Sequence, residues 1–133
     1  MRKILFRSKR IDNGEWIEGC LIHKISSVGD KQLILIIGSV EWDDHTGLFH
    51  LCNIHHVFPE TIGQFTGIHD IHGNKIFEGD IVTALMDYGP AGMNKSTVCI
   101  EFDINAGGYE WQYFDLDTIE IIGNKYDNPE LLD

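Results

Sequence analysis

The sequence predicts a mainly β fold: a single small domain over residues 1–133, with short antiparallel strands in a barrel-like arrangement and little helix. Many apolar runs of strand length are separated by glycine-rich turns. No stretch shows the apolar spacing of a helix of ordinary length. The length of 133 residues and the hydrophobic content of 43% suit one domain with a substantial core.

The pattern is densest in residues 62–84, around which we expect the domain to be organised. A strand there leads into a turn at 70–74, where Gly73 tolerates the positive φ that a tight hairpin needs. Gly79 and Asp80 predict a second turn before the next strand. The apolar residues of these short strands are Phe65, Ile68, Ile76, Phe77, Ile81 and Val82.

In the first half of the chain, residues 3–10 and 15–23 are expected to form a hairpin. The residues Asp12, Asn13 and Gly14 between them are typical of a type I′ turn. Composition and hydrophobic runs then predict strands and loops that follow in alternation. These are a loop at 26–30, a strand at 32–37, a solvent-facing loop at 39–47 and a strand at 48–58.

In the second half, residues 86–95 are expected to form a loop and residues 109–114 an aromatic-rich strand. Near the end of the chain, Asn128 followed by Pro129 predicts a short helical turn, with Asn128 as its N-cap. The remaining elements are expected to be strands at 96–102 and 117–122, and a turn at 106–108.

The formal net charge is −11 at pH 7, which argues against a general nucleic-acid-binding surface, because such surfaces neutralise phosphates with Lys and Arg. The charge is unevenly distributed. The chain is acidic after Val98, with Lys125 as the one base there. The first ten residues carry a basic run with no acid: Arg2, Lys3, Arg7, Lys9 and Arg10. Both segments are expected to be solvated surface, with ion pairing between them as the alternative.

The chain shows no sign of a membrane segment, since its longest apolar run, residues 33–37, is far below the roughly 18 residues that span a bilayer. Basic residues up to Arg10 interrupt the core that a signal peptide would need. Cys20, Cys52 and Cys99 lack paired spacing and are expected to be reduced, buried thiols. Together these observations predict a cytoplasmic protein.

His50, Cys52 and His56 would share one face of the strand at 48–58, which raises the hypothesis of a metal site there. Cys and His side chains bind zinc, but structural zinc sites carry paired ligands on tight turns, and this spacing matches no such pattern. Ordinary strand residues are the favoured interpretation. We therefore predict no metal ligand, no cofactor and no catalytic residue.

No other constellation points to catalysis. The chain has no Gly-x-Ser-x-Gly elbow, no P-loop and no dinucleotide fingerprint. Asp115 and Asp117 flank Leu116, and solvated turn carboxylates are the favoured interpretation of this pair. An aromatic stripe on one strand face, either core or interface, is expected from Tyr109, Trp111 and Tyr113.

Three blocks of the sequence resemble the YopX family of phage and prophage proteins. They are ILFRSKR with GEWIEG at 4–19, TIGQFTGIHD with GNKIFEGDIV at 61–82, and IIGNKYDNPELL at 121–132. The blocks lie in the family's order and span the chain. Two departures are local: Ser8 stands where glycine is common, and Cys20 where an aromatic residue is common.

The resemblance implies a β-rich protein of a temperate phage or prophage, acting in the cytoplasm of a bacterial host. It implies no biochemical activity. The shared residues stand mainly at turns, which implies structural roles, and Trp16 is expected to anchor the core. The residues assigned such roles are Trp16, Gly19, Gly63, Gly67, Asp70, Gly73, Gly79, Asp80, Gly123, Asn124 and Pro129.

We expect a non-enzymatic accessory protein that acts by protein–protein contact, as a homo-oligomer or with a host or phage protein. The reasons are the lack of a catalytic constellation, the strand edges that a small β domain must cover, and the opposed charges of the two ends. The alternative is a nucleic-acid-associated regulatory or replication factor, acting through its basic N-terminus or as an acidic DNA mimic. A third hypothesis is a metal-dependent enzyme using residues 50–56.

Overall fold

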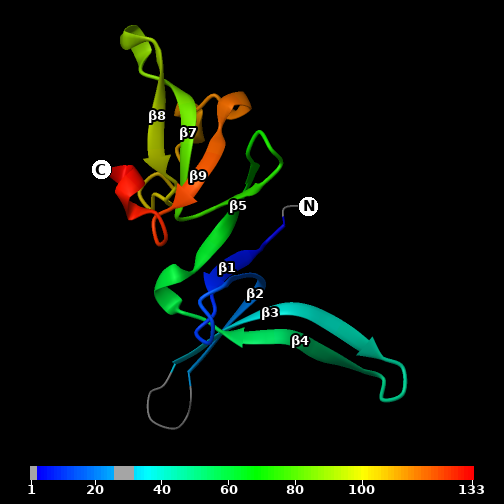
Figure 1. Cartoon of the computed structure of the whole chain (residues 1–133). Coiled ribbons are helices and arrows are strands. Elements are labelled where there is room, and N and C mark those ends of the chain that lie inside the picture. The colour runs from blue at the N-terminus through cyan, green and yellow to red at the C-terminus, as the bar shows by residue number, and fades with distance from the viewer. Residues whose placement is uncertain (1–2, 26–31) are drawn as a thin grey trace. The chain divides into compact units, whose positions relative to one another are not determined.

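The computed structural model describes residues 3–25 and 32–133 (Figure 1). These residues group into two compact units, 3–64 and 65–133. This division does not test the prediction of a single domain over residues 1–133, which therefore stays a prediction. The loop expected at 26–30 lies outside the described residues.

The first unit is an antiparallel sheet in the order β4-β3-β2-β1-β5. Only the first two residues of β5 belong to this unit, where Gly63 and Gln64 pair with β1. A 3-10 turn at Pro59–Thr61 leads into β5. The strands are β1 (Phe6–Lys9), β2 (Trp16–Ile25), β3 (Gln32–Asp43), β4 (Leu48–His56) and β5 (Gly63–His69).

The hairpin between β1 and β2 is confirmed, but its turn is not type I′. Gly14 has a φ of 71°, whereas Asn53 is the one non-glycine residue with positive φ in the described ranges, so Asn13 does not share the left-handed conformation. The amide of Arg10 donates to the Glu15 carbonyl at 2.9 Å, which closes a four-residue loop. The Asn13 side chain supports the loop by accepting from the Glu15 amide at 3.0 Å.

Ser8 joins β1 to the 3-10 turn that precedes β5. Its side chain is fully buried, and its Oγ donates to the Phe58 carbonyl at 2.9 Å and lies 2.6 Å from Thr61 Oγ1. The Lys9 amide also donates to Thr61 Oγ1, at 2.9 Å. A buried hydroxyl is stable only when it is hydrogen-bonded, and here these contacts satisfy it.

The loop expected at 39–47 is wrong, because β3 continues to Asp43 and β4 begins at Leu48. The actual turn is confined to residues 44–47, where Gly47 has a φ of 68°. Charged residues in this stretch alternate with apolar ones, which is the pattern of a strand with two unlike faces.

The second unit contains the rest of β5, which pairs with β6, and a separate sheet in the order β8-β7-β9. Its core is formed by Ile76, Val82, Ala84, Ile100 and Ile119, each at most 4% exposed. The further strands are β6 (Lys75–Phe77), β7 (Asp80–Asp87), β8 (Met93–Cys99) and β9 (Glu120–Asn124).

Two buried carboxylates organise the centre of this unit. Asp70 is 6% exposed, and its side chain accepts hydrogen bonds from the amides of His72 (2.9 Å), Asn74 (2.9 Å) and Ile121 (3.2 Å). Asp80 is 2% exposed and accepts from the Phe77 amide at 2.8 Å. Both carboxylates are therefore built into turns, since each satisfies backbone donors that would otherwise lose their partners.

The glycines of this centre adopt conformations that other residues rarely reach. Gly73 and Gly79 have φ values of 82° and 92° at the two expected turns. Gly67 has a φ of 88° where the register of β5 with β6 shifts between Phe65 and His69.

A short C-terminal structure closes against β9. The Asn124 side chain accepts from the amides of Tyr126 (3.1 Å) and Asp127 (3.0 Å), and η5 (Pro129–Leu132) follows. Asn128 precedes η5 but forms no side-chain cap. Its Oδ1 instead accepts from the Asn124 amide at 3.3 Å, beside Gly123, so the expected capping role is wrong.

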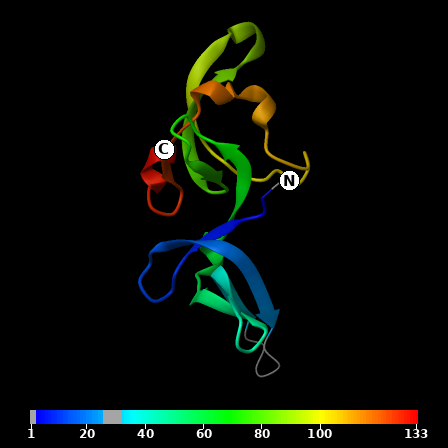
Figure 2. The same cartoon turned by 90° about the vertical axis from the view of Figure 1, so that its right-hand side faces the viewer.

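Three further expectations in this unit are corrected. The loop expected at 86–95 is shorter than predicted and is confined to residues 88–92, which contain η2 (Gly89–Ala91), because β7 continues to Asp87 and β8 begins at Met93. Residues 109–114 contain η3 (Trp111–Tyr113) in place of a strand. Residues 117–122 are divided between η4 (Leu116–Thr118) and β9. Both η3 and η4 appear as short orange coils beside the sheet (Figure 2).

The mainly β class with antiparallel strands and little helix is confirmed. The described helices are all short 3-10 turns, and the described sheets are curled without closing into a barrel. Among the residues described, no helix is long and apolar enough to cross a membrane.

Candidate interaction surface

The outer parts of β3 and β4 form a two-stranded ribbon, residues 39–52, which we call the β3–β4 ribbon (Figure 1). The β2 strand pairs with β3 only as far as Ile37, opposite Cys20. Beyond that point β3 and β4 pair only with each other, from Ser39 opposite Cys52 to Asp43 opposite Leu48. No third strand of the described sheet therefore pairs with an edge of the ribbon.

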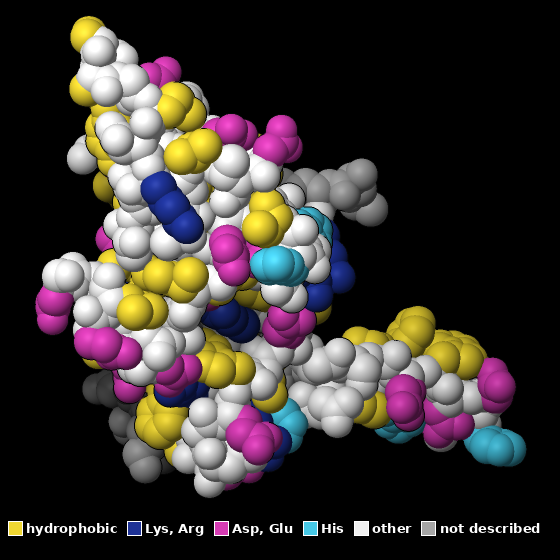
Figure 3. Space-filling model, turned by 45° about the horizontal axis from the view of Figure 1, so that its top comes forward, with side chains coloured by type: hydrophobic (Ala, Val, Ile, Leu, Met, Phe, Trp, Pro, Cys, Tyr) yellow, Lys and Arg dark blue, Asp and Glu magenta, His cyan; other side chains and the backbone are white. Residues whose placement is uncertain are grey.

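One face of the ribbon is apolar. The register pairs Val40 with Leu51 and Trp42 with Phe49, so all four side chains project to the same side. They are 55%, 51%, 54% and 69% exposed, respectively. The Trp42 and Phe49 rings meet edge to face, with centroids 4.8 Å apart. We call these four residues the apolar face. In Figure 3, apolar side chains gather along one side of the β3–β4 ribbon.

The opposite face of the ribbon is mainly polar. It pairs Ser39 with Cys52 and Glu41 with His50. His50 Nε2 lies 3.2 Å from Asp43 Oδ2. The hydrogen bond from the His45 amide lowers the pKa of Asp43, and the contact with His50 adds to this effect. Leu48, which pairs with Asp43 at the tip, is the apolar exception on this face.

The structure brings His50 and Cys52 onto this polar face but builds no metal centre from them. His56 pairs with Leu35 in the inner part of the sheet, away from the ribbon. Among the described residues, no three His, Cys, Asp or Glu side chains are grouped closely enough to hold an ion. Desolvation raises the pKa of Cys52, and the charge of Glu41 raises it further, so the thiolate that a metal requires is disfavoured.

The cysteines are free, as expected, but they are not deeply buried. Cys20 is exposed, and Cys52 and Cys99 are half-buried, so the expectation of buried thiols is wrong. Burial raises the pKa of Cys99, and the charge of Glu101 raises it further. This shift makes the Cys99 thiol a poor nucleophile.

Trp16 is half-buried and serves as a platform for cations, so its expected role as a core anchor is wrong. The Arg7 guanidinium carbon lies 4.7 Å from the ring centroid, and Lys9 Nζ lies 5.4 Å from it. Both distances are within the range of cation–π attraction. Part of the basic N-terminal run is therefore engaged within the first unit.

The remaining candidates have structural explanations. Asp115 Oδ1 accepts from the Asp117 amide at 3.1 Å, which makes this pair part of the turn at η4. The aromatic stripe is not on a strand face, because Trp111 and Tyr113 lie within η3. Gly19 is buried where β2 approaches β3, and an added Cβ would lie 2.1 Å from the Ile37 carbonyl oxygen.

Sequence reasoning missed the apolar face, although a signal for it was present. Val40 and Trp42 alternate with Glu41 and Asp43, which is the period of two that indicates a strand with one apolar face. The acidic residues and the nearby Gly47 favoured a loop instead.

Comparisons with known proteins place these features in context. The family model described as YopX protein matches residues 6–133. A search of curated proteins found no match. Among solved structures, the crystal structure of protein EF1440 from Enterococcus faecalis matches over 100% of both chains, with a TM-score of 0.63 and 24% identity. At this identity the likeness shows a shared fold.

Proposed function

The chain belongs to the YopX protein family, and from that premise we propose that it is a phage or prophage accessory protein that acts by protein–protein contact, beginning with a second copy of itself. The proposal places it in the cytoplasm of a bacterial host and assigns it no catalytic reaction. The observation that carries the proposal is the apolar face of the β3–β4 ribbon.

The extent of the apolar face supports a contact role. Its four side chains are each more than half exposed and adjoin one another through their strand pairing. Together they offer roughly 400 Å² of apolar surface, about half of what each partner contributes to a standard protein interface. Contiguous exposed apolar patches of this size mark interaction sites more often than single exposed residues do.

Charge supports a second copy as the occupant. A chain of net charge −11 repels its own copy except where the contacting surface is uncharged. The apolar face carries no ionisable group, and Glu41 and Asp43 project from the other side of the ribbon. The Asp44 carboxylate, which accepts from Trp42 Nε1 at 2.7 Å, lies at the tip edge of the face. Two copies can therefore pack these faces together without burying Glu41 or Asp43, and such a pairing closes as a two-fold dimer.

The apolar face also continues the core of the first unit. By strand alternation, Ile36 lies on the same side of β3 as Val40 and Trp42, and Ile36 is fully buried. This side of β3 is thus buried at Ile36 and apolar but exposed along the ribbon, whereas the other side, buried at Ile37, becomes polar there. A second ribbon would cover the exposed apolar side.

Substitution on the two faces tests the proposal. We expect Phe49→Glu to shift the protein from dimer to monomer in light scattering behind size exclusion, because it places a charge on the apolar face, opposite Trp42. Leu48→Glu is the matched control, since Leu48 is the adjacent residue, is 60% exposed and pairs on the opposite face. Leu48→Glu should leave the dimer intact. Circular dichroism checks that both variants keep their strands.

Salt separates this contact from ion pairing between the basic and acidic ends of neighbouring chains. An apolar contact should persist or strengthen in high salt, whereas ion pairs weaken. A wild-type monomer across the accessible concentration range would contradict the proposal. A dimer that dissolves in salt, or one that Leu48→Glu disrupts as much as Phe49→Glu, would contradict it as well.

A further inference from the structure

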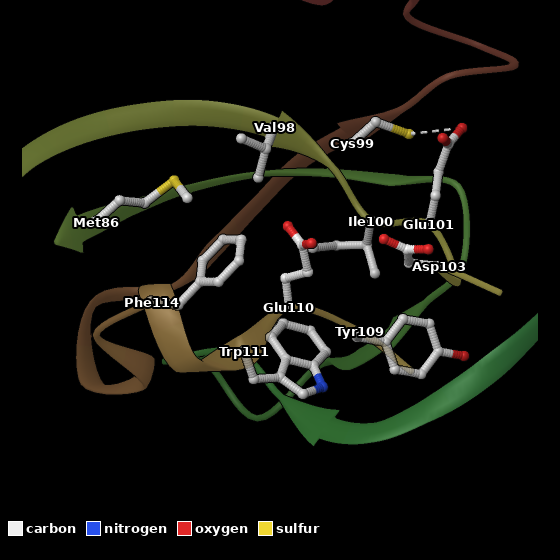
Figure 4. Close-up of a pocket in the computed structure, with 10 residues that line it drawn as sticks. All are labelled: Met86, Val98, Cys99, Ile100, Glu101, Asp103, Tyr109, Glu110, Trp111 and Phe114. Atoms are coloured by element: carbon white, nitrogen blue, oxygen red, sulfur yellow. Dashed lines mark hydrogen bonds between the residues drawn. The ribbon is translucent and has the colours of Figure 1, made fainter. Parts of the chain in front are cut away.

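A pocket of about 280 Å³ lies within the second unit, between strands β7 and β8 and the segment 109–114 (Figure 4). Its size is below that of sites for drug-sized ligands and suits a single small group. The pocket is separate from the β3–β4 ribbon, since all its lining residues belong to the second unit.

Aromatic rings form one wall of the pocket. Trp111 opens the η3 turn and Phe114 is the extended C-cap residue that follows it, and both side chains pack against the core of the unit. Their ring centroids are 5.6 Å apart, and Tyr109 extends the series with a centroid 5.7 Å from that of Trp111. All three side chains are half-buried against the core, which holds the rings in place.

Carboxylates form the rim. Glu101, Asp103 and Glu110 line the pocket, and no Lys, Arg or His is among its lining residues. Glu101 is partly neutralised, because Lys125 Nζ lies 3.3 Å from its Oε1. The Asp103 carboxylate accepts from the amides of Asn105 and Ala106 but has no ion-pair partner among the described residues.

Glu110 is the carboxylate that the rest of the described chain does not use. Its side chain has no hydrogen bond or ion pair with any described residue. In the close-up it extends across the pocket, between Phe114 and Ile100 (Figure 4). Its carboxylate therefore lies within the pocket, on the side of Phe114 and Ile100, where it is available to a cation.

The negative charge of the whole second unit also favours the binding of a cation in this pocket. Residues 65–133 contain thirteen Asp and Glu residues and three Lys residues, so almost all of the net charge of the chain lies in this unit. An acidic field of this kind raises the local concentration of cations and lowers that of anions.

We propose that this pocket binds an organic cation, an ammonium or guanidinium group carried on an alkyl chain. The charged head lies against the Trp111 ring and beside the Glu110 carboxylate, where cation–π attraction and charge pairing act together. The alkyl chain packs on the apolar side chains of Phe114 and Met86, which also line the pocket. A Lys or Arg side chain of a peptide and a free polyamine both carry this chemistry.

The test is a titration of the full-length protein followed by NMR of its indole groups. The indole signal of Trp111 is identified as the one missing from Trp111→Phe. The probes are cadaverine, agmatine and the blocked peptide acetyl-Gly-Arg-Lys-Gly-amide, and acetyl-norleucine-amide is a neutral control with an alkyl side chain. We expect a saturable shift of the Trp111 signal with the cations, weakened by salt, and none with the neutral control.

Two variants, each of which removes one negative charge, test whether the binding depends on the pocket itself. Glu110→Gln should weaken binding about 3- to 5-fold, as expected for a partly exposed charge pair. Glu130→Gln removes an equal charge from an exposed position outside the pocket and should change the affinity by less than about 2-fold.

The outcomes are distinguishable. A shift with the peptide alone identifies a basic side chain of a protein as the source of the cation, and a shift with cadaverine or agmatine includes free amines. The proposal is overturned if no cation moves the Trp111 signal, if acetyl-norleucine-amide moves it equally, or if both variants weaken binding alike. Dimerisation through the β3–β4 ribbon is scored separately, by light scattering on the same samples.

Discussion

Replacing Gly19 with alanine is expected to destabilise the first unit by about 3 kcal/mol or more, the largest stability loss that we predict for this unit. The added Cβ would lie 2.1 Å from the Ile37 carbonyl oxygen and 2.9 Å from Ile36 Cγ2. The first of these atoms belongs to the backbone of β3, so no side-chain rotation relieves the overlap. The β2 and β3 strands would have to separate where Cys20 pairs with Ile37.

Gly14→Ala provides the matched comparison for Gly19→Ala within the same unit. A Cβ at position 14 meets no atom within 4 Å, but the φ of 71° is unfavourable for alanine. The expected loss is about 1 kcal/mol. Urea unfolding followed by tryptophan fluorescence measures both variants, since Trp16 and Trp42 report on this unit. Equal midpoints for the two variants would show that the approach of β2 to β3 adjusts at little cost.

Replacing Asp70 with alanine is expected to cost about 2–3 kcal/mol in the second unit, because three backbone amides lose a charged acceptor. Two of these amides, of His72 and Asn74, belong to the turn at 70–74, and the third belongs to Ile121 in β9. The loss therefore loosens the turn itself and its attachment to β9. Thermal unfolding of Asp70→Ala and of the exposed Asp12→Ala compares the buried carboxylate with a surface one, for which we expect less than about 0.5 kcal/mol.

The contribution of Asp70 depends on pH. Burial raises the pKa of this carboxyl, but hydrogen bonds from the amides of Asn74, Ile121 and His72 outweigh burial, so the net pKa is lowered. A lowered folded-state pKa stabilises the protein at pH values above the ordinary aspartate pKa of about 3.9, and this stability is lost as the pH falls through the folded-state value.

We therefore expect the wild-type melting temperature to fall more steeply than that of Asp70→Ala as the pH is lowered from about 5 toward 3. The difference between the two proteins should be constant at neutral pH and shrink in acid. Parallel curves over this range would show that the Asp70 carboxylate is not stabilised by the amides around it.

Turns were the part of the fold that the sequence predicted best. Gly14, Gly73, Gly79 and Gly107 all have positive φ at turns that composition placed correctly. Turn residues act through their own backbone geometry, so their signal is local and readable without knowledge of the partners. The expected strands at the centre of the chain, β5, β6 and β7, follow from these turns and the apolar runs between them.

Elements whose form depends on distant partners were predicted less well. The aromatic residues at 109–114 favour a strand, yet Trp111 packs against the core from a 3-10 turn and Phe114 from the residue that ends this turn. Strand preference largely reflects packing on a sheet, so it does not hold where the segment packs on β7 and β8 from outside. The pocket could not be predicted either, because its aromatic wall forms only when residues 109–114 adopt this conformation against the core.

The β4 half of the ribbon falls within the strand expected at 48–58, whereas the outer part of β3 was missed. The acidic residues Glu41 and Asp43 between Val40 and Trp42, followed by Gly47, favoured a loop there. The register, in which Asp43 pairs with Leu48, shows that both strands continue to the turn at the tip of the ribbon, although the local composition suggested a loop.

The two-sidedness of the ribbon restricts how its length can change among relatives. Successive residues of a strand alternate between faces, so an insertion or deletion of one residue in each strand would exchange the surfaces at the tip and turn the acidic side chains to the side on which we propose the contact. Changes of two residues per strand preserve the arrangement. Relatives that retain the contact should therefore differ in ribbon length by whole repeats of two on both strands, with the turn at 44–47 moving outward or inward unchanged.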